Sequence, residues 1–540
     1  MRGGLYTWPA ALLLSSLLYL DLAVAATPAD DFNALIQELN QQFDAGHYGE
    51  AEQVAQKMVQ FAKSRAGQSS RAYAVAIGFL ANVYVKQRRP DEAAALFEKE
   101  LAIDERVLGA QHPYVAQDLF NLGGVYDGQG RYADAEQLLK RALAIDEKAL
   151  GPDDPATADA LGNLSSVYTN QDRYAEATQL LQRALAIREK ALGPNDPQTA
   201  ESLNTLAQAY LNQAHYADAV PLLERAVAIR EKAFGPESPD VAKSLNDLAR
   251  VYKHQGRYED AVNLHQRALA IREKALGADH VDVAESLNNL AETYRYQGRY
   301  AEALPLQQRA LTIREKALGP ENRDVAASLD YLAVVLADQG RFAEAIPLYQ
   351  RALAIYEKVY GREHFNVGVI LTDLTGAYLS EGRYDDAVAM AERALAIDEK
   401  TLGPEHHDLA ISLQTLADVY RLQGRYDDAT RLLQRAVAIL EKAVGPEHVD
   451  VASALASLAM VDRHQGHYAD AEPLLQRAVS IDEKALGPDS PDLAATLVNL
   501  ALVYENEEHY ADAVPLYRRA IGHRRKGPWT GAPQPCHRPQ

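Results

Sequence analysis

Residues 241–277, VAKSLNDLARVYKHQGRYEDAVNLHQRALAIREKALG, contain two apolar stripes separated by a glycine. The first stripe has the spacing i, i+3, i+4 and i+7, which places its residues on one face of a helix: Leu245, Leu248, Ala249 and Tyr252. The second stripe also has helical spacing and contains Ala261, Leu264, Ala268 and Ile271. Gly256 lies between the stripes, and glycine commonly ends a helix. The stretch therefore predicts two helices joined by a short turn.

This two-helix unit recurs with a period of 42 residues. The glycine after the second helix returns from Gly67 to Gly487, and an aromatic residue returns from Tyr48 to Tyr510, with Pro90 in one slot. We expect the aromatic side chains in the core because their spacing is helical. A single unit cannot bury both of its apolar stripes, whereas stacked neighbours can. The chain is therefore expected to form one repeat array rather than several unrelated domains.

The residue pattern resembles that of the tetratricopeptide repeat (TPR), in which two antiparallel helices form each unit. The matching residues are Leu245, Leu248, Ala249, Tyr252, Tyr258, Ala261 and Ala268. The 42-residue unit, for example residues 287–326, resembles the repeats of kinesin light chains. The resemblance covers roughly residues 30–522. It implies an all-α fold: a right-handed superhelical α-solenoid of stacked helix–turn–helix repeats.

The N-terminal residues differ from the array. MRGGLYTWPAALLLSSLLYLDLAVA has one basic residue, then an apolar run, then Ala23-Val24-Ala25, which is the order of a secretory signal peptide. The apolar run, from Trp8 to Leu20, is too short to span a bilayer. We expect cleavage after Ala25, no integral membrane segment after it, and export, which in a bacterium means the periplasm or the outside. Without a cleaved signal the protein would be cytoplasmic.

Four regions follow from these patterns: a signal peptide at 1–25, an N-terminal capping repeat at 26–66, the tandem TPR array at 67–522, and a disordered, basic, Pro-rich tail at 523–540. The capping repeat keeps the helical apolar spacing but lacks the Leu-Ala pair, as terminal units often do.

Charge and composition exclude several classes of function. The formal net charge of −20 disfavours nucleic acid as a partner, because an acidic chain repels phosphates. Cys536 is the single cysteine, which excludes internal disulfides and zinc ribbons. The sequence contains no nucleotide-binding, metalloprotease or serine-hydrolase motif. We therefore expect no catalytic residue, no metal ligand and no cofactor.

Two charged series repeat with the array, one beginning at Arg141 and the other at Glu105. Catalytic groups need individual environments to tune their pKa values, so residues copied about ten times are expected to be structural. We interpret both series as a salt-bridge and packing row on the second helix, with the Arg stems lying along apolar surface.

Function is expected where the copies differ. In tetratricopeptide repeats the first-helix face beside the Leu/Ala stripe lines a concave groove that holds peptides, so the resemblance implies a groove here. Asn amides can pair with a peptide backbone, and Arg or Lys can hold an acidic group. The candidate groove residues are Asn204, Gln208, Asn246, Arg250, Lys253, Asn288, Glu292 and Arg295.

The expected function is a non-catalytic scaffold that binds peptide segments or partner proteins in this groove. The partner's identity and the oligomeric state stay open. One alternative is an architectural component of an exported surface or secretion assembly. Another is an enzyme accessory subunit or a hydrolase.

Residues 402–410, LGPEHHDLA, contain four consecutive candidate metal ligands, from Glu405 to Asp408. The comparable turns place Asp, Ser, Asn or His three residues after the glycine, in the N-cap slot of the next first helix. His406 falls in that cap slot, and His407 in the following slot, where Pro is common. Adjacent helical residues do not face each other, so we expect a helix start here and no metal site.

Overall fold

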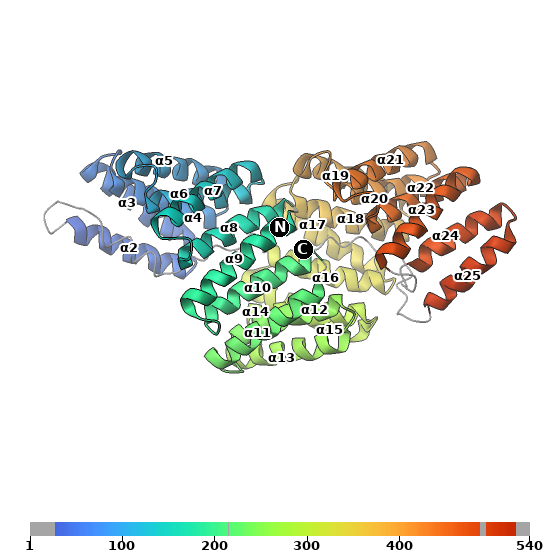
Figure 1. Ribbon diagram of the computed structural model, residues 1–540, viewed down its shortest axis with the longest axis horizontal. Helices are drawn as coiled ribbons and strands as arrows, with labels where there is room; N and C mark the ends of the chain where they lie inside the picture. The colour runs from blue at the N-terminus through green and yellow to red at the C-terminus, as the bar shows by residue number, and fades with distance from the viewer. Residues whose placement is uncertain (1–27, 172, 214, 487–492, 525–540) are drawn as a thin grey trace. The chain divides into compact units, whose positions relative to one another are not determined.

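The computed structural model describes residues 28–171, 173–213, 215–486 and 493–524. The predictions for the signal peptide and for the tail beyond Arg524 lie outside the described residues. Within the described ranges every regular element is an α-helix (Figure 1). No helix in these ranges is both long enough and apolar enough to cross a membrane. The chain divides into two compact units, Met1–Gln255 and Gly256–Gln540, which we call unit 1 and unit 2.

Unit 1 is an α-solenoid in which each helix packs against the next one along the chain. Its helices are α2 (Pro28–Asp44), α3 (Tyr48–Ala66), α4 (Arg71–Lys86), α5 (Pro90–Leu108), α6 (Pro113–Gly128), α7 (Tyr132–Ala149), α8 (Pro155–Asn170), α9 (Tyr174–Leu192), α10 (Pro197–Asn212), α11 (Tyr216–Phe234) and α12 (Pro239–His254). Even-numbered helices are the first helices of the repeats. They also contact the next first helix, as in α6 with α8 and α10 with α12.

Unit 2 repeats the same arrangement. Its helices are α13 (Tyr258–Leu276), α14 (Val281–Tyr296), α15 (Tyr300–Leu318), α16 (Arg323–Asp338), α17 (Phe342–Tyr360), α18 (Phe365–Ser380), α19 (Tyr384–Leu402), α20 (Leu409–Leu422), α21 (Tyr426–Ala443), α22 (Val449–Gln465), α23 (Tyr468–Leu486), α24 (Leu493–Asn506) and α25 (Tyr510–Arg524). The all-α solenoid expected from the 42-residue period is therefore confirmed in both units.

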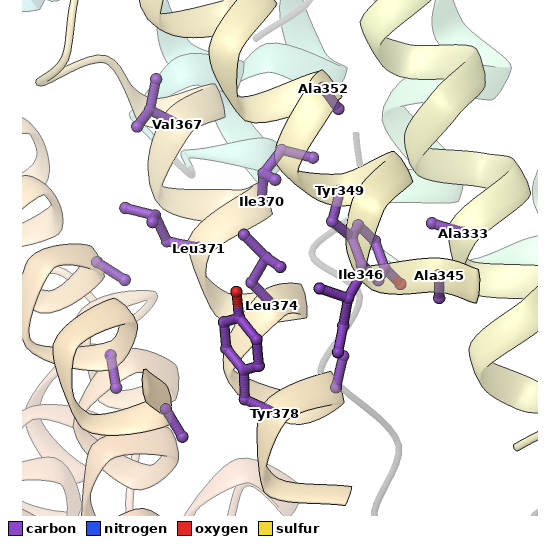
Figure 2. Close-up of a cluster of buried hydrophobic side chains, with 14 of the residues drawn as sticks. Ala333, Ala345, Ile346, Tyr349, Ala352, Val367, Ile370, Leu371, Leu374 and Tyr378 are labelled. Carbon is purple, nitrogen blue, oxygen red and sulfur yellow. The ribbon is translucent and has the colours of Figure 1, made fainter. Parts of the chain in front are cut away.

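Small and large side chains alternate in the core, as close helix packing requires. In Figure 2, Ile346 and Tyr349 of α17 lie between Ala333 of α16 and Leu374 of α18. Ala333 is fully buried, and Tyr349 is 2% exposed. A small residue at the position of Ala333 lets the first and second helices of a repeat approach closely, and the larger residues fill the space between repeats.

The expected N-caps are confirmed in most of the described turns. The side chains of Asp154, Asp196, Ser238 and Asn322 each accept a hydrogen bond from the amide two residues later. Histidine does the same through Nδ1, for example in His448 with Asp450 N at 3.3 Å. These contacts satisfy amides that a helix start would otherwise leave without a partner.

One turn departs from the expectation. His406 Nδ1 accepts from Asp408 N at 3.2 Å as a cap would, but α20 begins only at Leu409. The prediction of a helix start at His407 was therefore wrong by two residues. Amides here bond to the carbonyl three residues back, for example Leu409 to His406 at 3.0 Å, so the chain forms a tighter turn before the helix.

The prediction that the aromatic series beginning with Tyr48 lies in the core was also wrong. These residues are the first of each second helix, and most are half-buried, while Tyr384 and Tyr510 are 39% and 58% exposed. The fully packed aromatic series is the one at the end of the first helix, for example Tyr168 and Tyr378. A residue in the first helical turn lies at the repeat edge, where neighbours cover one side of its ring only.

The predicted salt-bridge row is confirmed. Each pair joins an Arg of one second helix to the Glu 36 residues earlier on the preceding second helix: Arg141–Glu105, Arg183–Glu147 and Arg225–Glu189 in unit 1, and Arg309–Glu273, Arg351–Glu315, Arg393–Glu357, Arg435–Glu399, Arg477–Glu441 and Arg519–Glu483 in unit 2. The Arg guanidinium often bonds a turn carbonyl as well, as Arg225 does with Pro194 O at 2.7 Å. The row therefore connects neighbouring repeats along their second helices.

Candidate functional site

A small pocket lies on the first-helix face of unit 1, between α10 and α12. Three of the eight candidate groove residues line it, and its volume is about 40 Å³. Its complete lining is Asn204, Ala207, Gln208, Leu211, Leu223, Asp247, Arg250 and Val251. That volume holds a water molecule or the end of a ligand side chain. The structure therefore brings together Asn204, Gln208 and Arg250, which are up to 46 positions apart in the sequence.

Asn204 forms the buried wall of this pocket, with 7% of its surface exposed. Its amide nitrogen donates to Asp247 Oδ2 at 3.0 Å and to Ser244 Oγ at 3.4 Å, both on α12. Its carbonyl oxygen Oδ1 is buried and accepts no hydrogen bond from any described residue. A buried acceptor without a donor costs about 1–3 kcal/mol.

Arg250 closes the opposite side of the pocket. One of its guanidinium nitrogens donates to Gln208 Oε1 on α10 and lies 3.4 Å from Asp247 Oδ1. Gln208 in turn donates to Asn212 Oδ1 at 2.8 Å. The Arg250 side chain is 22% exposed, so a charged group at the surface can still reach it. The pocket thus combines a buried acceptor with a partly accessible cation.

The other two candidates in unit 1 are as deeply buried as Asn204. Asn246 is 7% exposed and Lys253 is 6% exposed. The sequence interpretation treated the Asn series as amides available to a peptide backbone. The structure instead directs the Asn204 amide nitrogen to the neighbouring first helix. Asn204 therefore contributes to a contact between repeats, and peptide contact would fall mainly to Gln208 and Arg250.

The three candidates in unit 2 also make contacts within the protein. Asn288 is 6% exposed, and its amide, oriented to suit both neighbours, donates to Gln307 Oε1 at 2.6 Å and accepts from Arg314 at 2.8 Å. Arg295 on α14 pairs with Asp338 Oδ2 on α16 at 2.8 Å, and its side chain is 14% exposed. Glu292 is half-buried on α14.

Beside these residues lies a carboxyl pair that sequence reasoning did not single out as a pair. Asp330 on α16 and Asp373 on α18 lie close enough to influence each other's pKa. Burial raises the pKa of Asp330 to about 7, against a smaller lowering effect of Arg295. Burial and then the neighbouring Asp330 raise the pKa of Asp373 well above its ordinary value. Two carboxylates this close cannot both ionise easily.

The sequence analysis did not predict Asp247 and Asp373 as members of these sites, and the reason can be identified. Asp247 and Asp373 both follow the candidate groove slot by one residue. On a single helix this position points away from the Leu/Ala stripe, so it looked like plain surface. In the folded array this position contacts the candidate groove position of the preceding repeat, 43 residues earlier, as Asp247 contacts Asn204. Variation between copies at this second slot was the signal available in the sequence.

Comparisons with known proteins agree with the fold. The tetratricopeptide-repeat family model matches residues 72–148, 128–190, 156–232, 216–274, 240–316, 324–400, 376–442 and 444–526. One similar solved structure is a Podosopora anserina protein with nearly identical TPR-like repeats of the kinesin-light-chain type. It is 32% identical over 38% of this chain and 98% of its own, with a TM-score of 0.34.

A second similar structure is BtubC (BKLC) from P. vanneervenii. It is 21% identical over 43% of this chain and 92% of its own, with a TM-score of 0.37. No curated protein matches the sequence. The family model covers well over half of the chain, and its matches run through both units. The chain therefore belongs to the tetratricopeptide-repeat family.

Proposed function

We propose that this protein is a non-catalytic scaffold that binds an extended peptide segment of a partner protein along the first-helix face. Tetratricopeptide repeats are typical of protein–protein interaction scaffolds, and the repeats cover most of the chain. The observation that carries the proposal is the pocket between α10 and α12, which Gln208 lines and where Arg250 is a partly exposed cation.

The pocket defines what the peptide must offer. An acidic side chain or C-terminus of the peptide would pair with Arg250. Leu211 and Leu223 also line the pocket, so an apolar contact next to the polar group would add affinity. An extended segment with an acidic group beside a small apolar side chain fits this description.

The test uses substitutions that the array itself contains in the same slots. Gln208→Ser copies Ser166, and Arg250→Val copies Val334, so both residues fit a first helix of this fold. A displayed library of random 12-residue peptides would be selected on the full chain, and the enriched peptides measured by fluorescence polarisation. The double variant should lose at least tenfold in affinity.

The matched control is Arg225→Ala, which removes one salt bridge of the second-helix row and leaves the pocket intact. It should bind the selected peptides as the parent does. Failure to enrich any peptide, or equal binding by the parent and the double variant, would refute the proposed groove. Asn246→Ala and Lys253→Ala are poorer tests because both residues are buried, so their substitution would also disturb packing.

We also propose that the protein is exported. This rests on the sequence of residues 1–25, with its basic start, apolar run and Ala23-Val24-Ala25. N-terminal sequencing of the protein recovered from its native cells should begin at Ala26. A protein that retains Met1 or stays in the cytoplasm would contradict the export proposal without affecting the peptide-binding proposal.

A further inference from the structure

The turn before α20 differs in geometry from the other turns of its kind that the structure describes. At the corresponding turn before α22, the helix begins directly after His448, and the amides of Val451 and Ala452 both bond to the His448 carbonyl. Before α20, three residues from His406 to Asp408 precede the helix. The rule that adjacent helical side chains point apart therefore does not apply to them.

This turn brings three metal-ligating side chains together. The rings of His406 and His407 stack with their centroids 4.8 Å apart. His407 Nε2 lies 3.1 Å from Asp408 Oδ1. One ligand atom from each of the three residues lies within 4.8 Å of the other two. Among the described residues, no other group of three His, Cys, Asp or Glu side chains comes together in this way.

We propose that His406, His407 and Asp408 bind a divalent transition-metal ion. Two imidazole nitrogens and one carboxylate oxygen suit Zn²⁺, Ni²⁺ or Cu²⁺, whereas Mg²⁺ and Ca²⁺ prefer oxygen ligands throughout. His406 Nδ1 accepts the Asp408 amide, so the ring would coordinate through Nε2. The 3.1 Å between His407 Nε2 and Asp408 Oδ1 matches two neighbouring ligands that each lie about 2.1 Å from one ion.

The surroundings determine the kind of site. His407 and Asp408 are 30% and 21% exposed, so the ion would reach the site from solvent, and water would complete its coordination. Glu405 is occupied with Lys442 of α21, at 2.5 Å, and is not needed as a ligand. The three ligands lie in one turn, so the ion would hold that turn against the start of α20 and stabilise it.

The chain provides its own matched control. Residues 403–408 read GPEHHD and residues 445–450 read GPEHVD, so the two turns differ at one residue. His407→Val therefore converts the first turn into the sequence of the second, which forms a capped helix start in this fold. In the second turn, His448 Nδ1 and Asp450 Oδ2 lie 3.3 Å apart, a two-ligand arrangement without the additional imidazole.

The test is a titration of the untagged full chain with ZnCl₂ and with NiCl₂, followed by calorimetry. All proteins carry Cys536→Ser, which removes the thiol as a competing ligand. The parent should bind one ion that His407→Val loses, with at least a tenfold fall in affinity, while His448→Ala keeps it. Metal should also raise the melting temperature of the parent and of His448→Ala but not that of His407→Val.

Circular dichroism of the metal-free proteins establishes that His407→Val is folded. Equal stoichiometry and affinity in the parent and in His407→Val would overturn the proposal, since the ion would then lie elsewhere. The absence of binding by the parent at millimolar metal would overturn it as well. If His448→Ala lost the ion and His407→Val kept it, the metal would bind at the turn before α22, and the proposal would be refuted.

Discussion

Glu100 of α5 occupies the space that a side chain at Gly78 of α4 would need. Other repeats have Ala in the slot of Glu100, for example Ala142 and Ala184. Glu100 is 8% exposed, and its Oε2 has no hydrogen-bond partner among the described residues. The repeat accommodates a long acidic side chain because glycine provides room for it, but the position offers the carboxylate no compensation for its lost hydration.

The first prediction concerns the pH dependence of this part of unit 1. Burial, followed by Asp118 and Asp104, raises the pKa of Glu100 well above its ordinary value. Burial also raises the pKa of Asp104 to about 6 and that of Asp118 to about 8, although Arg71 opposes both shifts. Between the unfolded and folded pKa values the folded state holds more protons, so the free energy of unfolding should fall as the pH rises from about 4 to about 8.

Glu100→Ala should therefore stabilise α4 and α5 by roughly 1–3 kcal/mol at pH 8, with a smaller gain at pH 5. Hydrogen exchange of α4 and α5 peptides at the two pH values measures the effect locally, which suits an array that need not unfold in one step. Glu100→Gln is the control that removes the charge and keeps the volume. Equal gains at both pH values would indicate that packing, and not the proton, causes the effect.

A second prediction concerns the carboxyl pair of unit 2. Asp330→Asn introduces the residue found at Asn204 and Asn288 in the same slot. Because the folded pKa of Asp330 is about 7, against an ordinary value of 3.8 for an Asp side chain, the wild-type pair should lose stability as the pH rises from about 4 to 7. The variant should melt at a higher temperature than the parent at pH 8 and at nearly the same temperature at pH 4.

The contrasting variant for that experiment is Asp338→Asn. It weakens the 2.8 Å ion pair with Arg295 and should lower the melting temperature at neutral pH. If Asp330→Asn destabilised the protein at pH 8, the surroundings would stabilise the ionised pair, and the inferred rise in the pKa of Asp330 would be wrong.

A third prediction concerns the second-helix salt-bridge row. Arg225 and Glu189 lie 2.5 Å apart and are 37% and 33% exposed. A double-mutant cycle with both residues changed to Ala should give a coupling energy of about 0.2–1 kcal/mol, because water screens a pair this exposed. One molar NaCl should reduce the coupling further. The unconnected pair Arg225 and Glu147 should show none.

A fourth prediction uses the backbone. Glu508 has φ of +62°, in a slot where most repeats have glycine, for example Gly466 with φ of +80°. Side chains other than glycine pay about 1 kcal/mol in this left-handed conformation. Glu508→Gly should therefore stabilise α24 and α25 by roughly 1 kcal/mol in chemical unfolding. Gly466→Ala should have the opposite effect, and a stabilising result there would disprove the assumed strain.

A fifth prediction concerns Ala333, the small buried residue of α16 that packs against α17. Ala333 is fully buried next to α17, and Figure 2 shows it facing the side of α17 that bears Ala345 and Tyr349. Ala333→Leu should destabilise unit 2 by about 1–3 kcal/mol, because an overpacked core must shift its helices. Ala333→Ser, with the residue found at Ser165, should cost less. A calorimetric scan of the three proteins compares them directly, and a neutral Leu variant would show that the slot is not close-packed.

The sequence alone determined the helices, the turns and their order. The local signals act within about ten residues: the i, i+3, i+4, i+7 spacing, Gly256 at a helix end and the cap at Ser238. The sequence of each repeat therefore defines its own two helices. The Arg225–Glu189 row could also be predicted, because a strict 42-residue period implies that equivalent residues lie in register on successive helices.

Tertiary structure decided which polar residues are accessible. Asn204 and Lys253 looked like groove surface, but both are buried in the structure. The raised pKa values of Asp330 and Asp373 depend on the register of α16 against α18, which no single repeat encodes. The stacking of His406 on His407 accompanies the later start of α20, which the repeat pattern did not predict. Periodicity is a local property of the chain, whereas burial and proximity arise from the side chains that the next repeat brings into contact.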